Sequence, residues 1–455
     1  MSRPFILAAT ATALVCAAMM LYLLVRDASP RAAGTPPAQE PPRQAEAPAP
    51  PVIETAGEWN TYHGDHLLRG VAEAKIPEAP EVLWRLKTGA PVRQTPVVHD
   101  GRLFAVTARG EVIAADLDGK ELWRRELFRP DTADGKPARL GLEAPPLAFD
   151  GMVVLGSDEG VLLALDAATG EERWRRTLDG TVRGAPNWLP GVNRLFVLEQ
   201  SAGVLYCLDA ATGAEQWRAP GVERSDSTPS VSEKAIVFGS CAGALHVRSP
   251  ENGESLFDIK IEGDGQVAGG VALDGVLAYA GARGGMMIAA DTETGAILWT
   301  NEEARMEVFS TAAVNGDWVV FASHDGVVYA LDRATGKTRW THDTGGMPLS
   351  PVIVGDKVAV SADGTLFLLR LEDGAMIWSL ELGDEITGPA VTRRGLYVGG
   401  EDGTIVALGD ASMAGTAMPR GTGVPSVETA AVLPVNMPRG TGVPPVNDLE
   451  AAHGQ

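Results

Sequence analysis

Between positions 58 and 410 the chain alternates apolar and polar residues in short runs, and glycine-marked turns separate these runs. Alternation over short runs predicts antiparallel β-strands and is not typical of helices. A turn-plus-strand unit such as SDEGVLLALD can be followed eight times along this region. The glycines that mark the unit are Gly110, Gly160, Gly203, Gly243, Gly285, Gly326, Gly364 and Gly403.

These glycines lie about 40 residues apart, except for one longer first step, and about 40 residues hold the four strands of a propeller blade. We therefore predict an all-β fold, an eight-bladed β-propeller of four-stranded antiparallel blades, with seven blades as the alternative if one repeat is atypical. The last repeat stops at 406–410 without an outer strand, whereas 81–89 resembles an outer strand that precedes any complete repeat. We expect this N-terminal strand to complete the C-terminal blade and close the ring.

A second string recurs within the repeats. LDAATGEERW at 165–174 returns as LDAATGAEQW at 208–217 and as LDRATGKTRW at 331–340. Asp166 can accept hydrogen bonds from loop N–H groups, and Gly170 supplies the positive φ of a short hairpin with a bulge. A large flat side chain repeated once per blade suits the contact between neighbouring blades, so we interpret the string as a structural joint and not as a ligand site. The predicted inter-blade residues are Trp84, Trp123, Trp174, Trp217, Phe257, Trp299, Trp340 and Trp378.

The N-terminus carries a charge-free apolar run, residues 5–25, between Arg3 and Arg26. Its length fits a membrane-spanning helix better than the core of a cleaved signal peptide. We predict an uncleaved signal-anchor over 1–27, with a long signal peptide as the alternative. A lipid anchor on Cys16 is disfavoured because a valine precedes it where a small residue is expected. Both N-terminal alternatives place the rest of the chain on the extracytoplasmic, periplasmic side.

Two further segments flank the predicted propeller. Residues 28–57 are crowded with Pro and Ala, which predicts an extended, semi-rigid linker. The tail repeats MPRGTGVPSV at 418–427 as MPRGTGVPPV at 437–446, and its density of Gly and Pro predicts disorder. The predicted domains are 1–27 (signal-anchor), 28–57 (linker), 58–410 (propeller) and 411–455 (disordered tail).

Net charge and cysteine content limit which classes of ligand and partner are expected. The formal net charge of −21 would repel nucleic-acid phosphates and anionic lipid headgroups, so neither is expected as a general partner. Contact with the membrane is expected only through the N-terminal helix. Cys207 and Cys241 lie far apart and show no metal-type spacing. A disulfide framework is therefore excluded, while a single bridge stays open.

The strings GVLYCLDAATGAEQW and GVVYALDRATGKTRW resemble the PQQ-like repeat, which is found in quinoprotein dehydrogenases and in the outer-membrane assembly lipoprotein BamB. The lead-in WNTYHGDHLLRGV at 59–71 is also similar to the segment that often precedes these propellers. The resemblance covers roughly three quarters of the chain. It implies a propeller of the WD40-like and quinoprotein alcohol dehydrogenase-like superfamily, but fold and activity separate freely in such scaffolds.

The two branches of this family imply different functions. Quinoprotein dehydrogenases carry insertions that build a calcium and quinone site from a carboxylate, an amide, a catalytic Asp and, in many members, an adjacent Cys–Cys pair. This chain has short repeats, no adjacent cysteines and no acidic cluster outside its turns, whereas calcium needs about 6–8 converging oxygen ligands. The resemblance to BamB implies a non-catalytic protein-binding scaffold in outer-membrane or envelope protein assembly, with no PQQ, metal or catalytic residue. A PQQ-dependent dehydrogenase or quinone-site sensor is the alternative.

Two histidine-containing motifs are interpreted as structural. SHDG at 323–326 combines Ser, His and Asp but aligns with the repeated turn, so a hydrolase is disfavoured. HGDH at 63–66 lacks the further ligands of a zinc site, and we expect a solvated lead-in loop there.

The segment before each inner strand, VRQTP in the first repeat, should line one mouth of the central channel. The first four blades would present mainly charge there and the last four apolar groups, which suits a protein or peptide with one polar and one apolar side. The insertion at 127–144 projects from the same face, and loops on a rigid scaffold often carry recognition. Aligned on the Pro96 column, the predicted mouth residues are Arg93, Glu143, Arg183, Asp226, Val267, Phe309, Pro348 and Ile386.

Overall fold

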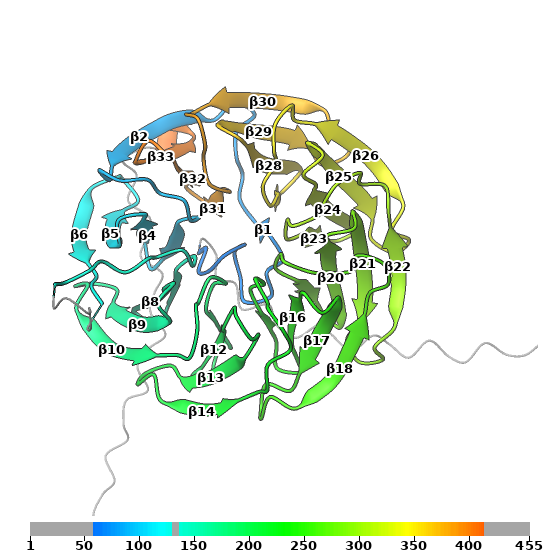
Figure 1. Cartoon of the computed structure of the whole chain (residues 1–455). Helices are drawn as coiled ribbons and strands as arrows, with labels where there is room; N and C mark the ends of the chain where they lie inside the picture. Colours follow the sequence, from blue (N-terminus) through cyan, green and yellow to red (C-terminus); the bar gives the residue numbers. More distant parts are fainter. Residues whose placement is uncertain (1–57, 130–135, 414–455) are drawn as a thin grey trace, which may run out of the picture. The chain divides into compact units, whose positions relative to one another are not determined.

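The computed structural model describes residues 58–129 and 136–413. Eight sheets stand around a central axis, so the prediction of eight four-stranded blades is confirmed (Figure 1). The predicted signal-anchor, the linker up to residue 57 and the tail from 414 lie outside the described residues. Within the described ranges, no helix is long and apolar enough to cross a membrane.

The first four blades follow one another in chain order. Blade 1 consists of β3 (Val97–His99), β4 (Arg102–Thr107), β5 (Glu111–Asp116) and β6 (Glu121–Glu126). Blade 2 consists of β7 (Leu147–Phe149), β8 (Met152–Gly156), β9 (Val161–Asp166) and β10 (Glu172–Thr177). Blade 3 consists of β11 (Asn187–Trp188), β12 (Arg194–Leu198), β13 (Leu205–Asp209) and β14 (Glu215–Arg218). Blade 4 consists of β15 (Ser230–Val231), β16 (Ile236–Ser240), β17 (Ala244–Arg248) and β18 (Ser255–Lys260).

The last four blades include two strands from the N-terminal side. Blade 5 consists of β19 (Ala272–Asp274), β20 (Leu277–Ala282), β21 (Met286–Asp291) and β22 (Ile297–Asn301). Blade 6 consists of β23 (Ala313–Asn315), β24 (Trp318–Ala322), β25 (Val327–Asp332) and β26 (Thr338–Asp343). Blade 7 consists of β27 (Val352–Val354), β28 (Lys357–Ala362), β29 (Thr365–Arg370) and β30 (Met376–Glu381), with β1 (Val71–Ala72) added parallel to β27. Blade 8 consists of β31 (Ala390–Thr392), β32 (Gly395–Gly399), β33 (Thr404–Gly409) and β2 (Glu81–Lys87), and a 3-10 turn, η1 (Ala411–Met413), follows.

The outer strand of blade 8 comes from the other end of the described chain. β2 pairs antiparallel with β33, from Glu81 opposite Gly409 to Lys87 opposite Thr404. Sheet edges with unpaired backbone groups invite association with other chains, and this pairing covers the outer edge of β33.

The hairpin between the third and fourth strands repeats around the ring. In blade 2, Asp166 Oδ1 accepts the backbone N–H of Ala168 (3.0 Å) and of Thr169 (2.9 Å), and Gly170 adopts a φ of 69°. The pairing of β10 with β9 then shifts register between Glu172 and Trp174, which is the bulge of a short hairpin. The hydrogen bond from the Arg173 guanidinium, together with the loop N–H groups, lowers the pKa of Asp166 to about 2.

The aromatic residue after each bulge packs on the hairpin of the next blade. A Cβ added at Gly213 of blade 3 would lie 2.6 Å from the Trp174 ring, so only glycine leaves room for the indole. The Trp174 Nε1–H donates to the carbonyl of Ala210, at 2.9 Å. Equivalent indole-to-carbonyl bonds join Trp84 to Leu117, Trp123 to Ala167, Trp299 to Arg333 and Trp340 to Leu371.

The remaining three predicted inter-blade residues do not form this indole-to-carbonyl hydrogen bond. Trp217 packs over Gly253 and Phe257 over Gly295, but neither makes the indole-to-carbonyl bond. Trp378 meets no hairpin of this kind, because β2 does not follow β33 in the chain.

Candidate functional site: the channel mouth above an N-terminal plug

The lead-in at 58–72 closes the central channel from within the ring. Figure 1 shows this segment and β1 at the centre of the propeller. It contacts the inner strands of successive blades in chain order, because each inner strand leaves backbone groups unpaired toward the axis. Trp59 pairs with Val98 of blade 1, and the carbonyls of Asn60, His66, Leu67, Arg69 and Gly70 accept N–H groups from Ala148, Val231, Leu273, Val314 and Ile353.

His63 lies at the centre of this plug and is only 3% exposed. Its Nδ1 lies 2.8 Å from the Leu68 carbonyl oxygen and its Nε2 lies 2.9 Å from the Pro351 carbonyl oxygen. Burial lowers the pKa of the imidazole, which favours its neutral form. The expectation of a solvated lead-in loop is therefore wrong, because the unpaired edges of the inner strands bind this segment.

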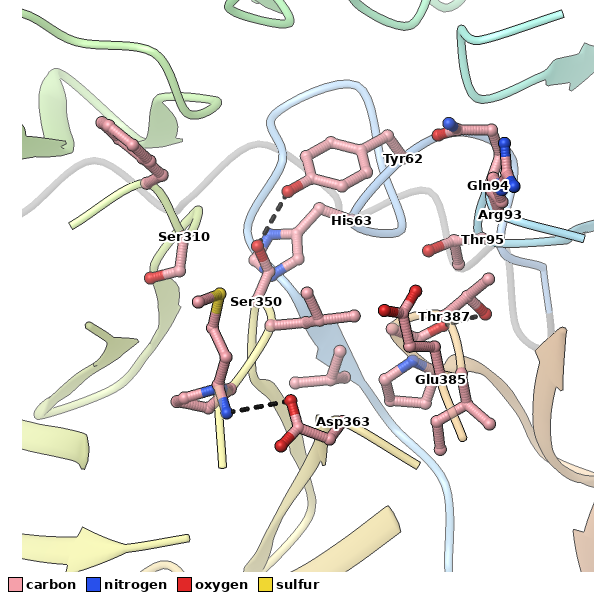
Figure 2. A pocket seen from close by; sticks show the side chains of 18 of the residues that line it. Tyr62, His63, Arg93, Gln94, Thr95, Ser310, Ser350, Asp363, Glu385 and Thr387 are labelled. Atoms are coloured by element: carbon pink, nitrogen blue, oxygen red, sulfur yellow. Dashed lines mark hydrogen bonds between the residues drawn. The ribbon is translucent and has the colours of Figure 1, made fainter. Parts of the chain in front are cut away.

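A pocket of about 490 Å³ opens above the plug, at one side of the channel mouth. Its floor includes Trp59, Tyr62 and His63. The Tyr62 hydroxyl lies 2.8 Å from the Ser350 hydroxyl (Figure 2). The walls come from the segments that lead into the inner strands of blades 1, 6, 7 and 8, so residues distant in sequence form one recess.

The turn of blade 7 beside the pocket is short. β28 and β29 are joined by two residues, Asp363 and Gly364, because Ala362 pairs directly with Thr365. The equivalent turn of blade 4 is longer, since Ser240 pairs with Ala244. Asp363 takes a φ of 47°, which is uncommon for a residue other than glycine, and its carboxylate accepts the Met347 N–H at 3.2 Å.

The structure divides the predicted mouth residues into two groups. Arg93, Phe309, Pro348 and Ile386 all line the pocket. Glu143, Arg183 and Asp226 belong to blades 2, 3 and 4 and are absent from its lining. The predicted insertion at 127–144 includes residues 130–135, which lie outside the described residues.

Ion pairs between neighbouring segments hold the charged mouth residues. Arg93 forms a bidentate contact with Glu401 of blade 8, at 2.9 and 2.7 Å. Arg183 pairs with Asp158 of blade 2, at 2.8 Å. These hydrogen bonds raise the pKa of both guanidinium groups. About half of each arginine side chain is exposed, so both remain available to a partner.

One position in the predicted mouth column is wrong. Val267 is 1% exposed, and its N–H bonds to Ser240 of the preceding blade as that of Val92 bonds to Gly400. It is thus the equivalent of Val92, and the equivalent of Arg93 is Ala268. Pro348 lines the pocket as predicted, and its neighbour Leu349, which is 41% exposed in the same lining, was not predicted.

A Ser–His–Asp relay in blade 4 also escaped the sequence analysis. The Ser240 Oγ lies 2.8 Å from His246 Nε2, and His246 Nδ1 lies 2.6 Å from Asp258 Oδ1. Ser240 is completely buried and its hydroxyl also accepts the Ala242 N–H, at 3.1 Å. No substrate can reach this hydroxyl, so the relay is a structural network. The three residues lie on three different strands, the first and the last 18 positions apart, so no short sequence motif predicts that they meet.

The residues that the structure describes do not bring together the ligands of a catalytic metal ion. In residues 58–129 and 136–413, no group of three or more His, Cys, Asp or Glu side chains could hold a metal ion. The pocket acids Asp363, Glu385 and Glu401 come from separate segments, and Glu401 is engaged by Arg93. These residues therefore do not fit a calcium and quinone site, which needs several anionic ligands at one point.

The fold and its mouth define a class: an eight-bladed β-propeller of PQQ-like repeats whose channel is filled by its own N-terminal segment. The family model described as outer membrane protein assembly factor BamB matches residues 74–133, 117–267 and 261–412. The chain belongs to this family.

Individual relatives agree with this assignment. The chain is 29% identical to an outer membrane protein assembly factor BamB of Xanthomonas campestris pv. campestris, over 70% of this chain and 81% of that protein. The crystal structure of BamB from Moraxella catarrhalis superposes with a TM-score of 0.61 at 21% identity, covering 73% of this chain and 100% of that one. A quinohemoprotein alcohol dehydrogenase from Comamonas testosteroni shares the fold, with a TM-score of 0.64 at 14% identity over 80% of this chain and 82% of that one.

Proposed function

We propose that this protein is a non-catalytic, extracytoplasmic protein-binding scaffold that acts in the assembly of outer-membrane or envelope proteins. The observation that carries the proposal is the family match, which extends over almost the whole propeller, from residue 74 to residue 412. The N-terminal apolar run at 5–25 would anchor the chain in the membrane and leave the propeller on the periplasmic side.

The channel mouth is the proposed binding face. It combines half-exposed arginines on blades 1 and 3 with exposed Met347 and Leu349 on blade 7. Such a mixture suits a protein surface, because partly solvated charges steer a partner while apolar groups supply contact area. The plug and its hydrogen bonds make the face rigid, which limits the entropy lost on binding.

The test is photo-crosslinking in the organism's own cells, with a photoreactive amino acid at Arg183 of the full-length chain. Arg224 is a third exposed arginine of the mouth, 3.0 Å from Asp226 of blade 4. We expect a crosslink to an envelope protein that is lost when Arg93→Ser and Arg224→Ser are added. A matched control removes Arg173 and Arg339, which form ion pairs on the outer strands, and should leave the crosslink intact. Equal crosslinking in both variants, or none in the wild type, would overturn the proposal.

The quinone-dependent alternative has a direct test of its own. Calorimetric titration of pyrroloquinoline quinone with excess calcium into the full-length protein should give no saturable heat, since the described acids do not converge on one point. Saturable binding near one equivalent would instead favour the quinone-site alternative.

A further inference from the structure

The pocket at the channel mouth presents an apolar wall that nothing covers in the described chain. Met347 is 50% exposed and Leu349 is 41% exposed, although both line a recess. The half-buried Phe309 ring lies beside them in the lining and meets His324 edge-on, with ring centroids 5.0 Å apart. Large apolar side chains gathered in a recess typically mark a binding site, and flexible methionine adapts to different guests.

The lining of the same pocket carries an excess of negative charge. Asp363, Glu385 and Glu401 line the pocket with a single arginine, Arg93, which is already paired with Glu401. Glu385 has no ion pair and no side-chain hydrogen bond to any residue that the structure describes. Its carboxylate is therefore free to pair with a cation from outside the chain.

Unpaired polar groups also line this pocket. Figure 2 shows Gln94 and Thr95 of blade 1 on the same side of the pocket as Glu385, with Ser310 of blade 6 on the other side. Neither the Gln94 amide nor the Thr95 hydroxyl has a side-chain hydrogen-bond partner within the described ranges. An amide and a hydroxyl can together donate to and accept from the main chain of a guest.

We propose that this pocket binds an extended peptide segment that places an apolar side chain against Met347 and Leu349 and an adjacent lysine or arginine against Glu385. The inference rests on the proposed scaffold function and names the chemistry of its partner. Charge selects the guest, because the free carboxylate attracts a cation and repels an acidic peptide. The unpaired Gln94 and Thr95 side chains favour a peptide over a simple organic cation, which has no main chain to bind.

The test uses three fluorescein-labelled peptides and fluorescence anisotropy on the full-length protein in detergent, with the detergent alone as the blank. The first peptide is Gly-Ser-Gly-Leu-Lys-Leu-Gly-Ser-Gly. The second has Glu in place of Lys, and the third has Ser in place of both Leu. We expect the first to bind at least about tenfold more tightly than either of the others.

A charge exchange makes the test specific to Glu385. Glu385→Lys should weaken binding of the lysine peptide about tenfold or more and allow the glutamate peptide to bind. Glu372→Lys is the matched control, since it makes the same charge change at an exposed position between β29 and β30 of blade 7, outside the pocket lining, and should preserve the wild-type order. Thermal denaturation and circular dichroism would verify that each variant is folded.

Several results would overturn the inference. These are equal binding of all three peptides, no binding of any, an unchanged order in Glu385→Lys, or competition by hexylammonium as strong as that of the lysine peptide. If these results occur while the Arg183 crosslink persists, the pocket assignment fails and the scaffold function stands. Peptide binding as expected without any crosslink would instead contradict the proposed cellular role.

Discussion

The joint between blades 2 and 3 and the joint between blades 3 and 4 use the same residue types but differ in their hydrogen bonds. At the first joint the Trp174 indole packs on Gly213 and donates to the Ala210 carbonyl. At the second, Trp217 packs on Gly253, yet its Nε1–H is buried without a partner. The equivalent carbonyl, that of Pro250, accepts the Arg194 guanidinium instead, at 3.0 Å.

The second joint also replaces apolar contacts by polar ones. In blade 4, His246 and Arg248 occupy the strand positions that Tyr206 and Leu208 of blade 3 occupy at the first joint. His246, Arg248 and Asp258 satisfy one another, but buried polar groups add little net stability compared with apolar packing. The same repeat can therefore form a strong or a weak joint between blades. The strength depends on whether the tryptophan indole or another side chain donates to the hairpin carbonyl oxygen.

The largest expected effect is the loss of the indole itself. Trp174→Ala should lower the free energy of unfolding by about 3–5 kcal/mol, because it leaves a cavity between two blades. Trp217→Ala should cost about half as much, since Trp217 is only half-buried and makes no hydrogen bond through Nε1. Urea denaturation followed by far-ultraviolet circular dichroism measures both. Equal costs would contradict the claim that the two joints differ in strength.

The glycine beneath the indole should be the next most sensitive position. Gly213→Ala should cost about 2–4 kcal/mol, because alanine is strained at a φ of 70° and its Cβ would lie 2.6 Å from the Trp174 ring. The control is Gly191→Ala, at a φ of 79° with no atom within 4 Å of the added Cβ, which should show the backbone strain alone, about 1–2 kcal/mol. The same denaturation measurement compares them. If both substitutions cost the same, the indole does not need the glycine.

A phenylalanine scan isolates the hydrogen bond. Trp174→Phe should cost about 1 kcal/mol more than Trp217→Phe, because only the first loses a bond and strands the Ala210 carbonyl. Both substitutions remove the same atoms. The cost of the smaller side chain therefore largely cancels when the two changes in the free energy of unfolding are subtracted.

Removing Arg194 should make the weak joint resemble the strong one. In an Arg194→Met background the Pro250 carbonyl is free to accept the Trp217 Nε1–H, so Trp217→Phe should become more costly than in the wild type. A double-mutant cycle by urea denaturation measures this coupling. An unchanged cost would show that Arg194 is not what prevents the bond.

The smallest expected effect is a dependence on pH at the weak joint. Burial lowers the pKa of His246 below its ordinary value of 6.5, with Asp258 acting in the opposite direction. Below pH 6.5 the unfolded chain therefore takes up a proton that the folded chain resists, and stability falls with decreasing pH. The wild type should therefore lose more stability than His246→Leu between pH 7.5 and pH 5.5.

Denaturation at the two pH values measures that difference directly. His63 and His66 are shifted in the same direction by burial and are present in both proteins, so their contribution cancels. A steeper loss in His246→Leu than in the wild type would reverse the sign of the argued shift.

Much of the fold could be predicted because its repeated positions have local causes. The apolar run of β9 and the Asp166-to-Gly170 hairpin depend on neighbours within ten residues, so they can be recognised in the chain. The mouth could be predicted only in part. Arg93 and Phe309 line the pocket as expected of the mouth column, but Val267 was misplaced because blade 5 has Val271 where most blades have proline.

The sequence by itself determined the eight blades and the residues available for each joint, because strand alternation and hairpin geometry are local. The burial of the polar lead-in at 58–72 follows only from the tertiary structure, since its partners are the inner strands of seven blades, six through backbone groups and blade 3 through the Asn187 side chain. The tertiary structure also decided which distant segments line the pocket, and which carbonyl oxygen accepts the N–H of each indole. These contacts join residues of different blades that are far apart in the sequence, so they cannot be predicted from the pattern within one repeat.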